Sequence, residues 1–273
     1  MADRADDDQV AAAAALVAAA ERIVVLTGAG ISTDSGIPDF RGPNGVWTKN
    51  PAAEKASTLS HYVGDPAVRR AAWQARLTSP AWQAQPNDGH RALVALAAGG
   101  RLHTLITQNI DGLHQAAGSE PASVVEVHGT IHRWTCLSCG ASGPMVEALD
   151  RVRAGEDDPA CREQGPGGDP CGGIVKSATI SFGQSLVEAD LERAMEAART
   201  CDLLLAVGST LGVYPIAQAV PIAHHSGARL VIVNAEPTPF DVIADAVVRA
   251  PISDVLPHIV QQPAAQPGGG TSA

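Results

Sequence analysis

Residues 23–32 read Ile-Val-Val-Leu-Thr-Gly-Ala-Gly-Ile-Ser, and this stretch decides the fold class. The apolar, largely β-branched run at 23–27 is typical of a strand buried on both faces. Gly28 and Gly30 follow it and permit a tight turn in which backbone N–H groups can approach a pyrophosphate. The third glycine comes only at Gly36, and the ending of an ATP-type P-loop is missing. The loop alone therefore fits a dinucleotide site or a plain strand-to-helix turn.

Short apolar runs of the same kind recur at 104–107, 123–127, 203–208 and 229–234. Helix-like stretches lie between them, at 90–98, 186–199 and 215–225. This alternation predicts an α/β fold, a Rossmann-like parallel sheet with helices on both faces.

Two stretches interrupt the alternation and are interpreted as insertions, a small helical one at about 42–84 and a small zinc-binding module at about 132–175. The sheet domain then comprises about 10–41, 85–131 and 176–260. The acidic N-terminus at 1–9 and the Gly/Pro-rich tail at 261–273 are expected to be disordered, because they carry little apolar surface to bury.

The composition excludes several function classes. The chain has 273 residues and a formal net charge of −10, and it has no basic block with which to grip nucleic acid. The apolar run at 10–20 is too short to span a membrane, and the segment before it is acidic where a signal peptide is basic. We therefore expect a cytoplasmic protein with neither nucleic-acid nor membrane partners.

Polar residues follow the expected strands. Residues 36–41 (Gly-Ile-Pro-Asp-Phe-Arg) form a stiffened loop in which Asp39 can hold a ribose, Phe40 can cover a ring and Arg41 can meet a phosphate. Further motifs follow the later strands: Thr107-Gln108-Asn109-Ile110-Asp111, Val127-His128-Gly129, Gly208-Ser209-Thr210 and Asn234-Ala235-Glu236. Open parallel sheets bind ligands at the carboxyl ends of their strands, so one crevice can collect all of these groups.

In this order, the motifs resemble those of the sirtuin family of NAD-dependent protein-lysine deacylases, in its bacterial form. The resemblance covers roughly residues 20–260. It implies NAD as co-substrate, one structural zinc ion and acylated-lysine proteins or peptides as partners. The cofactor-binding residues that it implies are Gly28, Ala29, Gly30, Ser32, Asp39, Phe40, Arg41, Gln108, Asn109, Ile110, Asp111, Gly208, Ser209, Thr210, Asn234, Ala235 and Glu236.

The resemblance also implies catalytic roles for His128 and Asn109. The acyl oxygen of an acetyl-lysine attacks the anomeric carbon of NAD as nicotinamide leaves, and His128 then deprotonates a ribose hydroxyl that attacks the imidate. The products are free lysine, nicotinamide and O-acetyl-ADP-ribose. Phe40 is expected to shield the reacting carbon from water. An imidazole that titrates near neutrality suits the role of base.

Four of the five cysteines cluster in a way that indicates zinc. Cys136 and Cys139 form a C-x-x-C knuckle, but the second half departs from the pattern, because Gln164 stands three residues after Cys161. We interpret 164–170 as a loop inserted within the second knuckle, with Cys171 as the fourth ligand. The alternatives are a three-cysteine site completed by His132 or water, or a weakened site.

The segment 177–183 occupies the place of the family's substrate-pairing strand. By resemblance, an extended acyl-lysine peptide adds between this segment and 212–214, so Phe182, Gly183, Gly212 and Val213 are expected to bind substrate. Members of the family that remove succinyl or malonyl groups carry a Tyr and an Arg in the spacing A-x-x-x-Y-x-x-R. The residues around Tyr62 do not match this spacing. Acetyl or another neutral acyl group is therefore expected.

Two other functions remain open. A protein mono-ADP-ribosyltransferase could use the same fold, and a non-catalytic NAD- or zinc-bearing interaction module could carry the same motifs. His128 argues against the second, because a pure binding module has no need of a base in the crevice.

Overall fold

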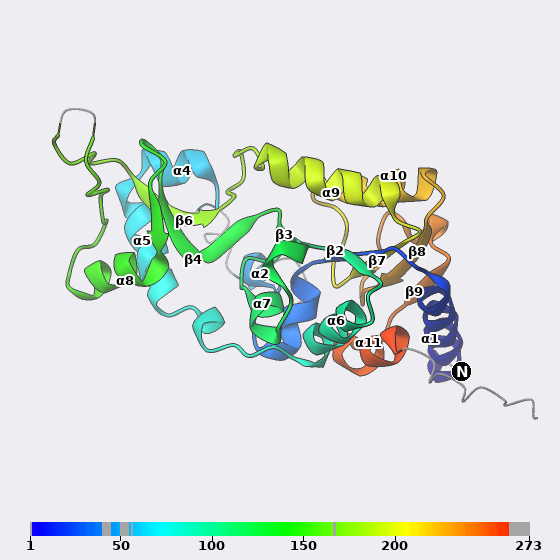
Figure 1. Cartoon of the computed structure of the whole chain (residues 1–273). Helices are drawn as coiled ribbons and strands as arrows, with labels where there is room; N and C mark the ends of the chain where they lie inside the picture. Colours follow the sequence, from blue (N-terminus) through cyan, green and yellow to red (C-terminus); the bar gives the residue numbers. More distant parts are fainter. Residues whose placement is uncertain (1, 40–44, 50–54, 56, 166–167, 262–273) are drawn as a thin grey trace, which may run out of the picture.

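The computed structural model of the chain describes residues 2–39, 45–49, 55, 57–165 and 168–261. Six parallel strands form the main sheet in the order β3-β2-β1-β7-β8-β9 (Figure 1). They are β1 (Ile23–Thr27), β2 (Leu102–Thr107), β3 (Val124–Glu126), β7 (Leu203–Val207), β8 (Arg229–Val233) and β9 (Ala246–Val248). The expected Rossmann-like sheet is confirmed, and the chain order reverses at β1, which lies between β2 and β7.

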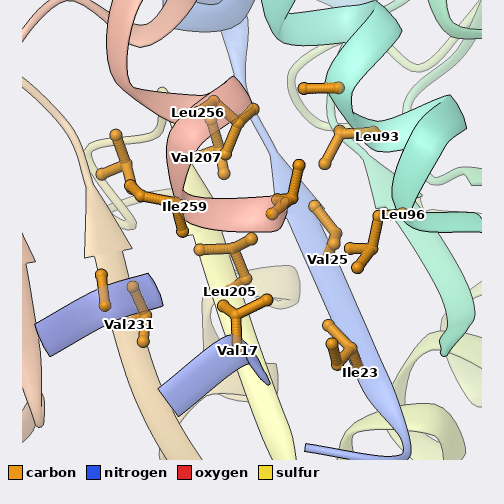
Figure 2. Packing of buried hydrophobic residues seen from close by; sticks show 14 of the residues in the cluster. Val17, Ile23, Val25, Leu93, Leu96, Leu205, Val207, Val231, Leu256 and Ile259 are labelled. Carbon is orange, nitrogen blue, oxygen red and sulfur yellow. The ribbon is translucent and has the colours of Figure 1, made fainter. Parts of the chain in front are cut away.

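Helices cover both faces of this sheet. One face packs against α1 (Ala2–Ala19), α6 (Asp88–Ala98) and α11 (Ile252–Val260). Figure 2 shows this core, to which Val17 of α1, Val25 of β1 and Leu256 of α11 belong. The other face packs against α9 (Glu188–Thr200) and α10 (Ala219–His225). Alternate residues of each strand enter the two cores, which is why the strands read as continuous apolar runs.

Short elements connect the strands to the longer helices. They are the 3₁₀ segments η1 (Ala29–Ser35), η3 (Pro121–Ser123), η4 (Ile216–Gln218) and η5 (Asp241–Ile243), and the helix α7 (Leu113–Ala117).

The two insertions pack together into one small lobe. It holds an antiparallel sheet in the order β5-β4-β6, made of β5 (Ser142–Pro144), β4 (Gly129–Cys136) and β6 (Val175–Thr179). Around it lie α4 (Leu59–Gly64), α5 (Pro66–Leu77), η2 (Pro80–Trp82) and α8 (Met145–Arg153), and α2 (Val46–Lys49) lies earlier in the insertion. A separate core joins Trp73 of α5 to Met145 of α8 and Val175 of β6. The lobe's strands therefore extend to 129 and 179, beyond the expected limits of the zinc module.

The structure differs from expectation at the N-terminus. Helix α1 begins at Ala2, so the expected disorder over 1–9 is wrong for the described residues 2–9. The alanine-rich run that follows has the highest intrinsic helix propensity, and the side chain of Gln9 accepts a hydrogen bond from the backbone N–H of Val247 at 3.0 Å. Strand β9 and helix α11 were not predicted at all. The tail beyond Gln261 lies outside the described residues.

Within the described part of the chain, no helix is both long enough and apolar enough to cross a membrane.

Candidate functional site

Two loops approach backbone to backbone at the point where the strand order reverses. The N–H of Gly30 donates to the carbonyl of Gly208 at 2.8 Å. A Cβ on Gly28 would lie 2.7 Å from that same carbonyl oxygen, and a Cβ on Gly208, whose φ is +65°, would lie 2.4 Å from the nitrogen of Ile31. Only glycines allow this contact, which lies at the carboxyl ends of β1 and β7. Open parallel sheets bind their ligands at this edge, and we call it the crevice.

The residues after β2 bind to the loop after β1. Asn109 and Asp111 are each only 7% exposed. The Asn109 amide donates to the Gly28 carbonyl and to Ser32 Oγ, both at 3.1 Å, and Ser32 Oγ donates to Asp111 Oδ2 at 2.8 Å. Because the Asn109 amide nitrogen is thus occupied, its Oδ1 is the atom left to face a ligand.

His128 stands at the end of the β3 segment with a defined tautomer. Its Nδ1 lies 3.0 Å from the carbonyl oxygen of Gln108, and a carbonyl can only accept, so Nδ1 carries the proton and Nε2 carries the lone pair. Burial lowers the pKa of His128, and the Gln108 carbonyl partly opposes this shift. The ring is therefore neutral at pH 7, with Nε2 able to accept a proton.

Gln108, which follows β2, and Ser209, in the loop after β7, connect the loops on either side of β1. The Gln108 side-chain amide donates to Ser209 Oγ at 2.7 Å, and the same oxygen accepts from the N–H of Leu211 at 3.1 Å. Leu211 is buried at φ +54°, a conformation that is costly for a residue with a Cβ. This strained turn fixes Ser209 at the crevice.

The loop after β8 is stabilised by hydrogen bonds from an arginine. Asn234 donates its amide to the Glu236 carbonyl at 2.7 Å, which leaves Asn234 Oδ1 as an acceptor. Arg249, at the end of β9, donates to the carbonyls of Asn234 and Glu236 at 2.6 and 2.8 Å and pairs with Asp241.

The other predicted cofactor residues divide into those at the crevice and those outside the described chain. Ala29 lies in η1 next to the glycine contact, the Ile110 carbonyl accepts from Ile131 N–H, and the Asp39 carbonyl accepts from Val46 N–H. Thr210 and Ala235 are exposed, each in the loop after its strand. Phe40 and Arg41 lie outside the described residues.

The segment expected to pair with substrate is anchored on both sides. Ile180 N–H donates to the His128 carbonyl at 2.8 Å, and Phe182 exchanges two backbone hydrogen bonds with 57–59. Phe182 is 38% exposed, and Gly183, at φ +80°, follows it in the open. Gly212 is exposed and Val213 is half-buried in the loop after β7.

The four cysteines of the small lobe converge. The sulfurs of Cys136, Cys139, Cys161 and Cys171 all lie within 4.8 Å of one another, with separations of 3.8 Å between Cys136 and Cys171 and 3.7 Å between Cys139 and Cys161. Sulfurs around a tetrahedral zinc ion with Zn–S bonds of about 2.3 Å would be about 3.8 Å apart, so the set fits zinc. Gln164 and Pro170 pair as a short bridge, so the inserted loop returns Cys171 to the cluster. His132 points elsewhere, because its Nε2 contacts the Asp111 carbonyl at 2.7 Å.

A buried network beneath the crevice was missed in the sequence. His114 Nε2 and the Thr27 hydroxyl lie 2.9 Å apart, Thr27 bonds to Thr107, and the Thr107 hydroxyl accepts from Asn109 N–H at 3.0 Å. The available signal was that two neighbouring strands both end in threonine.

Fold and site together define a dinucleotide-binding enzyme of Rossmann type with a zinc-bearing small lobe. The Sir2 family model matches residues 28–215, so the chain belongs to the Sir2 family. A relative from Streptomyces coelicolor, NAD-dependent protein deacetylase 2, is 47% identical over 239 residues, which is 88% of this chain and 96% of that protein. NAD-dependent protein deacetylase 1 of Bradyrhizobium diazoefficiens is 42% identical over 86% of this chain and 88% of that protein.

Solved structures agree with this assignment. A structure described as the structural basis for the mechanism and regulation of Sir2 enzymes matches with a TM-score of 0.81 and 38% identity, over 93% of this chain and 97% of that one. A Sir2 variant with deacetylated p53 peptide and 3′-O-acetyl-ADP-ribose matches with a TM-score of 0.80 and 33% identity, over 90% and 95% of the two chains.

Proposed function

We propose that the protein removes acetyl or other neutral acyl groups from protein lysines with NAD as co-substrate. The observation that carries the proposal is the neutral His128, which follows β3 at the carboxyl edge of the sheet and whose Nδ1 proton is held by the Gln108 carbonyl, so that Nε2 carries the lone pair. NAD supplies the electrophilic ribose carbon and the hydroxyl that takes the acyl group. A mono-ADP-ribosyltransferase remains the competing enzyme, and a non-catalytic NAD- or zinc-bearing module is the third alternative.

The chain's own groups divide the work. The backbone at Gly28, Gly30 and Gly208 lets a pyrophosphate approach closely, and Ser209 lies beside it. Asn109 and Asp111 orient the nicotinamide-ribose end, and Asn234 Oδ1 accepts from the adenosine ribose. His128 takes a proton from a ribose hydroxyl at Nε2 and keeps its Nδ1 proton on the Gln108 carbonyl.

The zinc ion is structural in this proposal. Four thiolates fill a tetrahedral shell, so no position is open for chemistry. Because thiolates that bind zinc stay reduced in the cytoplasm, we also propose that the protein works there.

The test is to incubate the protein with NAD and an acetyl-lysine peptide and to follow the products by mass spectrometry. We expect deacetylated peptide and O-acetyl-ADP-ribose in equal amounts, and a loss of rate of about 10²–10⁴-fold in His128→Ala. The matched control is His103→Ala, because His103 is exposed near the amino end of β2 and contacts Arg22. It should retain the wild-type rate.

Two outcomes would contradict the proposal. ADP-ribose attached to protein, with the peptide still acetylated, would identify the transferase. No NAD consumption with any acyl peptide tried would leave only the binding module.

A further inference from the structure

Two cations lie in the core of the small lobe without a carboxylate. Lys176 of β6 is 1% exposed, and its Nζ donates to the carbonyls of Ser177, at 3.0 Å, and Thr179. Arg76 of α5 is half-buried and places its guanidinium 5.5 Å from the ring centre of Tyr62 and 5.0 Å from that of Trp73. Among the ion pairs of the described residues, none includes Lys176 or Arg76. Buried charges without a counter-ion are costly, so their presence calls for a role.

Both cations form hydrogen bonds with the same short stretch of β6, at Ser177 and Thr179. Arg76 Nη2 donates to Ser177 Oγ at 3.1 Å, and Ser177 Oγ and Thr179 Oγ1 lie 2.9 Å apart. Together with the two carbonyls bound by Lys176, these contacts fix the backbone and side chains of residues 177–179.

Residues 177–179 lie beside His128 and belong to the segment expected to pair with substrate. Thr179 pairs with Gly129, the residue after His128, and Ile180 N–H donates to the His128 carbonyl at 2.8 Å. Three residues further on lies Gly183, which is exposed and ends the segment expected to pair with a peptide. The contacts therefore run from Arg76 through Ser177 and Thr179 to β4, which begins at Gly129, directly after His128.

We propose that Arg76 and Lys176 are positioning residues that hold residues 177–180 in the conformation needed to align an acylated peptide with His128. They touch neither reactant. This inference rests on the proposed deacylase function, and it assigns to the small lobe's helix α5 a part in substrate alignment.

The charges of Arg76 and Lys176 influence each other, and this effect can be measured as a change in the pKa of Lys176. Burial and, to a smaller extent, the positive charge of Arg76 together lower the pKa of Lys176 to about 8. Removing the Arg76 charge should therefore raise the pKa of Lys176. The chain has only three lysines, Lys49, Lys55 and Lys176, so the signal of Lys176 can be followed in protein labelled at lysine ¹³Cε.

The experiment compares wild type with Arg76→Met, Lys176→Met and Ser177→Ala. We expect the KM for an acetyl-lysine peptide to rise about tenfold in Arg76→Met and Lys176→Met, and less in Ser177→Ala, because the segment with which the peptide pairs would lose its fixed conformation and bind the peptide less well. The KM for NAD at saturating peptide should stay within about twofold, since the glycine crevice is untouched. Ser177→Thr, which keeps the hydroxyl, should restore the peptide KM.

The matched control is Arg151→Met on α8 of the same lobe. Arg151 pairs with Glu156 and makes no contact with β6 among the described residues. It should leave both KM values unchanged.

Three results would overturn the proposal. The first is a peptide KM that is unchanged in folded Arg76→Met and Lys176→Met, and the second is a Lys176 pKa that does not rise in Arg76→Met. The third is Arg76-dependent turnover of a succinyl-lysine peptide, which would make Arg76 a substrate-contacting residue. If the wild type deacylates no peptide, the proposed function fails. The positioning role can then be tested separately by following the titration of the His128 ring by NMR. This titration should shift in Arg76→Met and stay unchanged in Arg151→Met.

Discussion

His90 and His114 form a buried pair beneath the glycine loop, with ring centres 5.0 Å apart. Burial lowers the pKa of His90 to about 4 and, with the added effect of His90, that of His114 to about 3. His90 also completes the capping box of α6 with Asn87, whose amide holds the Ile31 carbonyl of η1 at 2.7 Å. The pair therefore joins α6 and α7 to the loop expected to bind NAD, and it does so in neutral form.

This pair should make the protein acid-sensitive well above the pKa values of its carboxylates. In the unfolded chain both histidines bind protons as the pH falls through about 6.5, whereas in the folded protein they stay neutral to about pH 4, so the unfolded state binds more protons. The free energy of unfolding should therefore fall as the pH drops from about 6.5 to 4, by a few kcal/mol in total. Urea titrations between pH 7.5 and 4.5 measure it, and His114→Gln should flatten the slope. An equal slope in wild type and His114→Gln would contradict the assignment.

Sequence reasoning reached single residues best where they end a strand. Asn109, Asp111, His128 and Asn234 all lie at the crevice, because the carboxyl ends of parallel strands meet at one edge. The contacts of Thr27 and His114 could not be predicted, because they depend on how α7 turns back over β1, and no local pattern encodes that packing.

At the scale of elements, the β4–β6 ladder depends on Gly129. Its φ is +71°, and a Cβ there would lie 2.0 Å from the carbonyl oxygen of Ala178. This glycine therefore lets the two strands pass closely. Gly100 offers a matched comparison, because its φ is +74° and a Cβ there would meet nothing within 4 Å.

We expect Gly100→Ala to lower the free energy of unfolding by about 1–2 kcal/mol, the penalty of the left-handed conformation alone. Gly129→Ala should cost about 2 kcal/mol more, because the backbone must also move apart, and it should raise the KM for peptide. Denaturant unfolding and peptide kinetics on the two variants measure both effects. Equal destabilisation would show that the close strand contact is unimportant.

Some elements carried too weak a pattern to be predicted. Strand β9 has only three residues, and helix α11 is short and contains Pro257, a residue that normally breaks a helix interior. Strands β4 and β5 of the small lobe were missed because most of their residues are half-buried or exposed, and β4 is irregular, with a register shift between Gly129 and Trp134.

At the scale of the whole molecule, the two lobes have separate cores, and Cys136 and Cys161 belong to that of the small lobe. Removing zinc should therefore loosen the small lobe and leave the main sheet intact. We expect a chelator to increase hydrogen exchange in 129–179 and in α5, with β1, β7 and β8 remaining protected.

Cys171→Ser should reproduce this exchange pattern and lose most of the bound metal, measured by elemental analysis. Cys201→Ser is the control, because Cys201 lies in the large-lobe core and its thiol donates to the Ala198 carbonyl, so it should keep a full zinc complement. Uniform loss of protection across both lobes would mean that the molecule unfolds as one unit.

The place of β1 at the centre of the sheet also affects folding during synthesis. One of its neighbours, β7, begins at Leu203, paired with Ile23 about 180 residues earlier. At about 5–20 residues per second, a ribosome needs roughly 9–36 s to supply that partner after β1 is made. During that interval an apolar strand has one open edge, and pairings so distant in the chain also form slowly. The nascent chain is therefore a natural client for a chaperone until β7 has emerged from the ribosome.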